Sequence, residues 1–351
     1  MKAQFSSSRI AAVAACVPRQ SVELGQFKDV WGDSEVAQIV ANTGITHIRQ
    51  AAEGVTTADL CCAAARAIFA DQEVDPQSID GIVFVSQTPD YVMPATSAVL
   101  QHRLGLDRRV VAFDINYGCS GYIYGLLQAD MLIQSGMCQS VLVLAGDTTT
   151  HFVNPRDRAL RMLFGDGGSA TLVVRGENQH SYAVRTDGSG AKSLIVPAGG
   201  TRQKRDGNTC IARAAEDGNF RSDENLFMDG IAVLFMALRD APEAIGEALA
   251  LAQWERENVT FYGLHQANRF MIEYLARKMK TPPEITPFAC ENIGNTGPAS
   301  IPVMLANDQA RSRNSGRYEK SVLCGFGVGF SVAAVTLPLD TTRILDLVEL
   351  D

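Results

Sequence analysis

Three observations predict that the chain folds as an α/β protein. Short apolar runs bounded by Gly, Pro or Asp recur along the sequence and are typical of buried strands. Longer stretches with helical periodicity lie between them, and this alternation is what an α/β fold requires. The expected strands are residues 10–17, 82–86, 110–115, 141–146, 170–174, 322–326 and 331–337. The expected helices are residues 57–71, 122–135, 228–251 and 271–279.

The third observation is a faint internal repeat. The run SVLVLAG ends at residue 146, and a glycine-rich turn and a strand follow it; SVLCGFG ends at residue 327 with a similar sequel. The repeat predicts two halves, residues 1–176 and 177–351. Two unrelated strands that end in Gly would also look alike, so the pattern alone leaves a chance likeness open. The polar segment 199–225 is expected to be a surface loop of the second half.

Composition and charge exclude several classes of protein. The 351 residues are 46% hydrophobic and 20% charged, which suits a large buried core and excludes disorder. Asp and Glu number 39 against 31 Lys and Arg, a net charge of -8, so nucleic acid is not an expected partner. The longest apolar runs, 141–146 and 231–238, fall far short of the roughly 20 residues of a membrane span. We expect a cytoplasmic protein that does not cross a membrane.

The eight cysteines form no CxxC pair and no Cys/His cluster with zinc spacing. We therefore expect no metal site. Most of these cysteines should be small buried residues in a reducing compartment. No bound cofactor is expected either.

Cys119 is the candidate nucleophile. It lies in a glycine-flanked turn between an expected strand and an amphipathic helix. The N–H groups at a helix N-terminus favour thiolate over thiol, and the small neighbours Gly118, Ser120 and Gly121 leave room for an acyl group. A thiolate is suited to thioester exchange. A buried structural cysteine would fit the same segment, so the assignment depends on partner residues.

His265 and Asn295 are the candidate partners. His265 follows the apolar stretch 259–264, at the end of an expected strand, where α/β folds present reactive groups. Asn295 lies in the segment NIGNTGPAS, just before apolar helical sequence. Taken singly, the histidine would equally suit a buried core position and the asparagine a turn or helix cap.

Together these segments resemble the Cys-His-Asn site of the β-ketoacyl-acyl-carrier-protein synthase III family, within the thiolase superfamily. The resemblance runs from the first strand to the last strand near residue 337. The matching motifs are Asp114 with Cys119, NPRDR at 154–158, FGDG at 164–167, HQAN at 265–268, GNT at 294–296 and GFGVGF at 325–330. The family fold implied is a five-layered α-β-α-β-α sandwich of two similar halves, paired as a homodimer.

The resemblance also implies a mechanism. Cys119 takes an acyl group from a thioester, and His265 and Asn295 stabilise the enolate formed when a malonyl thioester loses carbon dioxide. The backbone N–H groups of Cys119 and Val328 form the oxyanion hole. Family members usually carry Gly where this chain has Val328, so bulk is added beside the acyl pocket.

Substrate-binding positions depart from the family pattern. Gln38 and Asn42 stand where the family has a Trp and an Arg that hold the adenine of coenzyme A, while Arg158 keeps the matching basic residue. The donor is therefore expected to be carried by an acyl carrier protein, although coenzyme A stays open.

Three further positions are assigned by resemblance. Asn268 belongs to the substrate-binding motif, and Phe270 occupies the place of a family Arg that docks the acidic carrier protein. Met93 matches the residue that closes the partner's acyl tunnel across the dimer, and ordinary core packing is the alternative. A basic patch for the carrier protein is expected from nearby cations, which could equally form a solvated helix face. These cations are Arg269, Arg277, Lys278 and Lys280.

The predicted function is decarboxylative condensation of an acyl and a malonyl thioester to a β-ketoacyl product. The altered substrate residues indicate a specialised or secondary-metabolite pathway. Two alternatives stay open: an acyltransferase that moves the acyl group to an alcohol or amine, and an inactive subunit of a heterodimer. A papain-like hydrolase and a nicotinamide-binding protein are disfavoured because their local signatures are absent.

Overall fold

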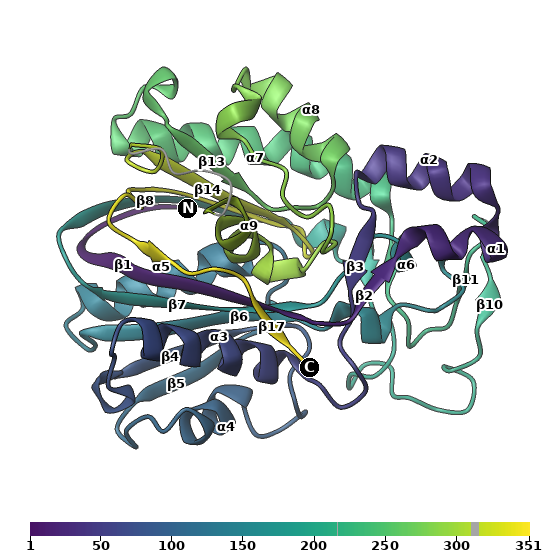
Figure 1. Cartoon of the computed structure of the whole chain (residues 1–351), viewed down its shortest axis with the longest axis horizontal. Coiled ribbons are helices and arrows are strands. Elements are labelled where there is room, and N and C mark those ends of the chain that lie inside the picture. Colours follow the sequence, from purple (N-terminus) through teal and green to yellow (C-terminus); the bar gives the residue numbers. More distant parts are fainter. Residues whose placement is uncertain (216, 310–315) are drawn as a thin grey trace.

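The structure, a computed structural model, describes residues 1–215, 217–309 and 316–351. Its main sheet runs in the order β13-β14-β15-β8-β1-β7-β6-β4-β5 (Figure 1). The strands of the first half are β1 (Lys2–Pro18), β4 (Gly81–Val85), β5 (Val111–Ile115), β6 (Ser140–Asp147) and β7 (Gly167–Arg175). Those of the second half are β8 (Asn178–Thr186), β13 (Phe261–Leu264), β14 (Ser321–Gly327) and β15 (Ser331–Leu337).

Four strands of each half have the same topology, and β5 is an additional strand of the first half. In the first half β4 and β6 are parallel, and β6, β7 and β1 follow as antiparallel neighbours. In the second half β13 and β14 are parallel, and β14, β15 and β8 follow in the same way. β1 joins the halves, because its first residues pair with β8 and the rest pair with β7. The boundary expected at residue 176 falls in the turn between β7 and β8, and the division into two domains stays a prediction.

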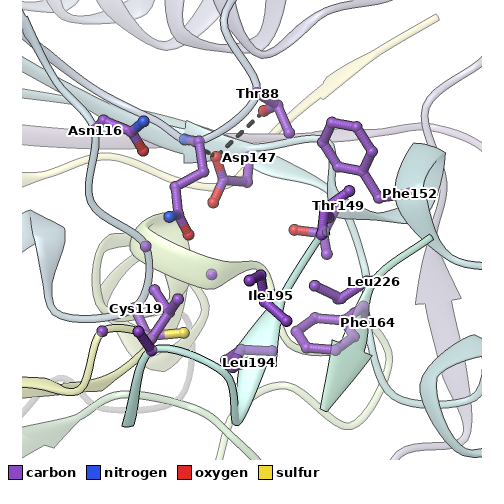
Figure 2. Close-up of a pocket in the computed structure, with 17 residues that line it drawn as sticks. Thr88, Asn116, Cys119, Asp147, Thr149, Phe152, Phe164, Leu194, Ile195 and Leu226 are labelled. Atoms are coloured by element: carbon purple, nitrogen blue, oxygen red, sulfur yellow. Dashed lines mark hydrogen bonds between the residues drawn. The ribbon is translucent and has the colours of Figure 1, made fainter. Parts of the chain in front are cut away.

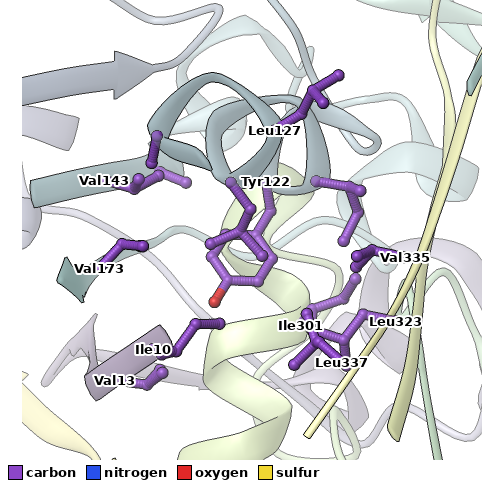
Figure 3. Packing of buried hydrophobic residues seen from close by; sticks show 14 of the residues in the cluster. Ile10, Val13, Tyr122, Leu127, Val143, Val173, Ile301, Leu323, Val335 and Leu337 are labelled. Atoms are coloured by element: carbon purple, nitrogen blue, oxygen red, sulfur yellow. The ribbon is translucent and has the colours of Figure 1, made fainter. Parts of the chain in front are cut away.

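Helices and sheets form five layers, which confirms the predicted fold class (Figure 1). The strands of each half form one layer of the main sheet, called here the first and the second sheet. α3 (Thr57–Asp71) and α4 (Thr96–Arg103) cover the outer face of the first sheet, and α7 (Gly230–Ala252) and α8 (Arg269–Met279) cover the outer face of the second. α5 (Gly121–Gln134) and α9 (Ser300–Gln309) lie between the sheets. Figure 3 shows this middle layer: Tyr122 and Ile301 of the two helices pack against strand residues of both halves, such as Val173 and Val335.

Burial explains which elements were predictable. α3 has the predicted bounds because a capping box of Thr56 and Asp59 fixes its start. α5, α7 and α8 begin within two residues of their predicted starts. β8 escaped prediction because its sequence, NQHSYAVRT, is largely polar although most of it is buried. The polar start of β1 was missed for the same reason.

The predicted surface loop 199–225 contains a short hairpin of β10 (Arg213–Ala214) and β11 (Phe220–Arg221), and its residue 216 lies outside the described residues. The loop is anchored beside α6 (Arg158–Arg161), where Arg221 pairs with the buried Asp157. In the described part of the chain, no helix has both the length and the apolar character that a bilayer crossing demands.

Candidate active site

The two central helices begin beside the same small cavity. Cys119 immediately precedes the N-cap of α5, Asn295 lies in the turn before α9, and His265 follows the last residue of β13. All three side chains line one cavity of about 90 Å³. Parallel strands β13 and β14 and the starts of both helices place these distant residues together, as strand ends do in α/β proteins.

The Cys119 thiol is almost completely buried, with 9% of the residue exposed. Burial raises the pKa of Cys119 to about 12, and the charge of Asp147 acts in the same direction. Hydrogen bonds from the backbone N–H groups of Cys119 and Val328 lower the pKa, but burial outweighs them. Burial therefore outweighs the helix N-terminus that led to the expectation of a thiolate, and the pKa of Cys119 favours the protonated thiol at neutral pH.

Two glycines allow the backbone to approach this sulfur. A Cβ on Gly327 would lie 2.7 Å from the Cys119 Cβ and 3.0 Å from its Sγ. A Cβ on Gly118 would lie 2.5 Å from Gln87 Oε1 and 2.7 Å from a methyl carbon of Val328. A side chain at either glycine would therefore clash with the nucleophile or with the residues around it.

Val328 is held close to the nucleophile by two serines. The Ser331 hydroxyl donates to the Val328 carbonyl at 2.8 Å, and the Ser120 and Ser331 hydroxyls are 2.6 Å apart. Since Ser120 is the N-cap residue of α5, this chain of contacts ties the Val328 backbone to the start of the helix. The N–H groups of Cys119 and Val328 thus face one sulfur from two sides.

His265 is buried, and its ring orientation is fixed. Its Nδ1 lies 2.6 Å from the hydroxyl of Ser300, the first residue of α9. The same hydroxyl accepts from the backbone N–H of Gln266 at 3.4 Å. The ring of Phe326 packs edge-on against the imidazole at 5.4 Å. Burial lowers the pKa of His265 to about 3, so the ring is neutral at physiological pH.

Asn295 has an equally defined orientation. Its Oδ1 accepts a hydrogen bond from the backbone N–H of Gly297 at 3.0 Å. Its backbone pairs with the segment around Phe164, which fixes the turn. The Nδ2 group is therefore the part of the side chain that remains available to donate into the cavity.

A second, larger cavity of about 400 Å³ also reaches Cys119 (Figure 2). One wall is apolar and includes Phe164, Leu194, Ile195 and Leu226. Polar side chains line another part of the cavity, its polar wall: Gln87, Thr88, Asn116, Asp147 and Thr149. Cys119 thus lies where the two cavities meet.

Sequence reasoning missed the polar wall. Asp147 is buried, and its Oδ1 accepts from Ser86 Oγ, the Gln87 N–H and Thr88 Oγ1 at 2.9, 2.7 and 3.2 Å. Burial raises the pKa of Asp147 to about 7 despite these hydrogen bonds. The sequence does contain a signal for this residue, because Asp147 directly follows the expected strand 141–146 at its carboxyl end, where α/β proteins place functional groups.

Arg158 has a partner on the neighbouring helix. Its Nε lies 3.2 Å from Glu35 of α2 (Asp33–Thr43), and its Nη2 donates to the Asp217 carbonyl at 3.2 Å. Gln38 and Asn42 are exposed on the same helix. Arg158 lines neither cavity. A negative charge therefore already faces the cation that the sequence assigned to substrate.

The other predicted binding residues divide into two groups. Asn268 lines the small cavity and caps α8, with its Oδ1 accepting from the Met271 N–H at 2.8 Å. Phe270 is exposed next to Tyr274 and lines neither cavity. The four cations expected to form the basic patch lie at the two ends of α8. Arg269 lies over the Phe288 ring, whereas Arg277, Lys278 and Lys280 lie at the far end of α8 from the cavity.

Met93 lines neither cavity of its own chain and is 80% exposed, between the exposed Val92 and Pro94. Core packing is therefore the wrong interpretation of this residue. Its contact with a partner chain stays a prediction. Among the described residues, no three His, Cys, Asp or Glu side chains are grouped in a way that could hold a metal ion.

Comparisons with known proteins point to one family. A family model described as 3-oxoacyl-[acyl-carrier-protein (ACP)] synthase III matches residues 113–188, and the model of the C-terminal part matches residues 249–339. A β-ketoacyl-[acyl-carrier-protein] synthase III 3 of Streptomyces coelicolor is 33% identical over 340 residues, which are 95% of this chain and 98% of the relative.

Solved structures are similar over nearly the whole chain. A 3-oxoacyl-(acyl-carrier protein) synthase from Burkholderia xenovorans has a TM-score of 0.92 and 35% identity, and the match covers 100% of this chain and 99% of that one. The priming β-ketosynthase from the R1128 polyketide biosynthetic pathway has a TM-score of 0.79 and 28% identity, with 95% and 96% covered.

Proposed function

Because this chain belongs to the β-ketoacyl-[acyl-carrier-protein] synthase III family, we propose that it condenses an acyl thioester with a malonyl thioester to give a β-ketoacyl thioester. The observation that carries the proposal is the placement of Cys119, His265 and Asn295 around one cavity, with the sulfur at the junction to a second cavity. One cavity can then hold the acyl group while the other admits the second thioester.

The first step is thioester exchange on Cys119. Its sulfur attacks the carbonyl of the acyl donor, and the thiol proton leaves with the departing thiol of the carrier. The backbone N–H groups that face the sulfur, from Cys119 and Val328, stabilise the oxyanion of the tetrahedral intermediate. Gly327 and Gly118 leave space for this intermediate.

The second step is decarboxylation of the malonyl thioester. Loss of carbon dioxide leaves an enolate, and two neutral hydrogen-bond donors near its oxygen stabilise it. Asn295 supplies Nδ2, because its Oδ1 is already occupied by the Gly297 N–H. With the Ser300 hydroxyl donating to Nδ1, the neutral His265 ring carries its proton on Nε2 and becomes the other donor.

The carbon–carbon bond forms where the cavities meet. The carbanion attacks the acyl carbonyl on Cys119, and collapse of the intermediate breaks the bond to sulfur. The sulfur recovers a proton from solvent, and the β-ketoacyl chain leaves on the carrier of the second thioester. Because His265 and Asn295 line the small cavity, the malonyl group occupies that side and the acyl group occupies the large cavity.

We assign the donor to an acyl carrier protein. The pairing of Arg158 with Glu35 supports this choice, since a compensated cation is a weak site for the phosphates of coenzyme A. The small cavity is lined by the starts of α7 and α8, where Ile231, Phe235 and Phe270 are exposed. These apolar side chains offer a docking surface that replaces the expected basic patch.

A homodimer is part of the proposal. β5 forms an edge of the main sheet, and Tyr91, Val92 and Met93 beside it are exposed. Unpaired edge strands and exposed apolar groups are features that association would cover. Similarity to the priming β-ketosynthase of a polyketide pathway supports a specialised role.

Intact-protein mass spectrometry tests the proposal. Wild-type protein should gain the mass of an acyl group from an acyl carrier-protein donor and, with malonyl carrier protein, release a β-ketoacyl product. Cys119→Ala should abolish the mass gain because the nucleophile is missing. Cys210→Ala is the matched control, since Cys210 is the exposed cysteine of the described residues.

Three outcomes contradict the proposal. Acylation of the Cys119→Ala variant at the wild-type rate would disprove the nucleophile. Loading followed only by transfer to an alcohol or amine would favour the acyltransferase alternative. Absence of loading with every donor would favour an inactive partner subunit.

A further inference from the structure

The polar wall of the large cavity contains side chains that the proposed chemistry does not use. Among the described residues, the side-chain amides of Gln87 and Asn116 and the hydroxyl of Thr149 form no hydrogen bond. All three hydrogen bonds of the Asp147 side chain go to Oδ1, which leaves Oδ2 without a partner in the described structure. Asp147 is only 4% exposed, but it lines the cavity, where water or a ligand can reach Oδ2.

These polar groups come from the ends of three neighbouring strands. Gln87 follows β4, Asn116 follows β5, and Asp147 and Thr149 lie at the end of β6 and just beyond it. Hydrogen bonds from Gln87 and Thr88 to Asp147 hold the β4 and β6 ends together. The wall is therefore set by the sheet and does not depend on a mobile loop.

The wall begins next to the nucleophile. A Cβ at Gly118, the residue before Cys119, would lie 2.5 Å from Gln87 Oε1. The polar groups are consequently near the first carbons of a chain attached to sulfur, while Leu194, Ile195 and Leu226 line the apolar wall (Figure 2). A purely alkyl group would cover polar side chains on one wall and leave them without hydrogen-bond partners.

The charge of the polar wall limits which acyl groups the cavity can accept. Asp147 is the charged side chain on the cavity wall, and no described cation lines that wall. An acyl group with a second carboxylate would be repelled. A hydroxyl both donates and accepts, so it matches amide, hydroxyl and carboxyl partners together.

We propose that the large cavity selects a short acyl group with a hydroxyl near its carbonyl, recognised by Gln87, Asn116, Thr149 and Asp147. The inference rests on the proposed function in one respect, the loading of an acyl group on Cys119. These residues determine specificity; they take no part in the bond-forming steps.

The test compares three donors of nearly equal shape. Pantetheine thioesters of 3-hydroxybutanoate, 3-methylbutanoate and 3-aminobutanoate place a hydroxyl, a methyl or an ammonium at the same carbon. The rate of mass gain on Cys119 is measured for each, without malonyl carrier protein. Wild-type protein should load the hydroxy donor about tenfold faster than the methyl donor, below the limit for a fully buried site because Gln87 and Asn116 are exposed to solvent.

Variants of the polar wall test whether its side chains cause the preference for the hydroxy donor. Asn116→Leu and Thr149→Val keep the side-chain size and remove hydrogen bonding, so each should bring the ratio close to one or reverse it. Thr149→Ser keeps the hydroxyl and should keep the ratio. Circular dichroism and gel filtration establish that each variant is folded, and the ratio of two donors on one protein is insensitive to the fraction of active molecules.

A wild-type preference for the methyl donor, or a ratio that Asn116→Leu and Thr149→Val both leave unchanged, overturns the inference. Fastest loading of the amino donor overturns the choice of a neutral group. These results can be told apart from a failure of the proposed function. If condensation proceeds but the methyl donor is preferred, only the proposed specificity is wrong. If the protein is loaded but no β-ketoacyl product forms, only the proposed condensation is wrong.

Discussion

The two halves of the molecule share a four-strand arrangement but place different side chains at the cavities. After the second strand of each half, β4 leads to Gln87 on the wall of the large cavity and β13 leads to His265 in the small one. The strand after each central helix, β6 or β14, leads to Asp147 or to Val328. Under the proposed function, equivalent positions would recognise the acyl group in the first half and stabilise the transition state in the second.

Only the central helices depart from this division. α5 belongs to the first half but begins at the nucleophile, and α9 begins beside Asn295. The comparison teaches that a repeated fold need not repeat a site: equivalent strand ends line two different cavities, and both cavities reach Cys119. Substitutions in the second half should lower the condensation rate, and those in the first should change which donor is accepted.

The largest effect is expected in the second half. His265→Ala and Asn295→Ala should each lower malonyl decarboxylation about 10²- to 10³-fold, because each removes one donor to the enolate oxygen. Loading of Cys119 should stay within a few-fold of wild type. Release of carbon dioxide and mass gain on the protein measure the two steps separately. Loss of loading with normal decarboxylation would instead assign these residues to activation of the thiol.

Acid–base behaviour should differ in sign between the halves. Burial raises the pKa of Asp147 from 3.8 to about 7, so its contribution to stability falls as pH rises across that range. Burial lowers the pKa of His265 from 6.5 to about 3, so the unfolded state gains a proton first and stability falls as pH drops through that range. Between about pH 4 and 6.5 the two slopes oppose each other.

Asp147→Asn should remove the fall of stability with pH that Asp147 causes and leave the rise that His265 causes. Relative to wild type, the free energy of unfolding of the variant should rise by about 1.4 kcal/mol per pH unit between about pH 4.5 and 6. His265→Gln should change with the opposite sign. Urea unfolding followed by both fluorescence and circular dichroism at several pH values measures these differences. Parallel stability profiles for wild type and both variants would contradict the opposing pKa shifts.

The smallest effect is expected at the surface of the first half. Glu35→Gln should free Arg158 and lower the KM for acyl-coenzyme A donors about two- to fivefold, the range set by one exposed ion pair. The KM for carrier-protein donors and the kcat of both should change little. Lys28→Gln serves as the control, because Lys28 forms an exposed ion pair with Asp33 away from Arg158. An equal fall in KM for both donors would exclude a coenzyme A-specific role of Arg158.

Local patterns predicted the framework well. The apolar runs and helical stretches gave most strands and the four long helices, because these elements bury one continuous face and show it in their periodicity. The positions of Cys119, His265 and Asn295 were predictable for a related reason: each follows a strand or precedes a helix that the sequence displays. β8 was not, since its polar residues are buried by neighbours far away in sequence.

Properties that depend on packing could not be predicted. The thiol of Cys119 stays protonated because of burial, which a helix N-terminus does not reveal. Pairing of Arg158 with Glu35 requires α2 and α6 to lie side by side. The polar wall combines residues at the ends of three strands, so no single segment of the sequence predicts it.

The first strand has a consequence for how the protein is made. β1 is synthesised before every other strand, yet its partners are β7 and β8, which emerge only after residues 167–186 have left the ribosome. Until then both of its edges lack their main partners, and neither sheet can close. The halves therefore cannot mature one after the other during translation; completion of each waits for β7 and β8, the two strands from the middle of the chain that flank β1.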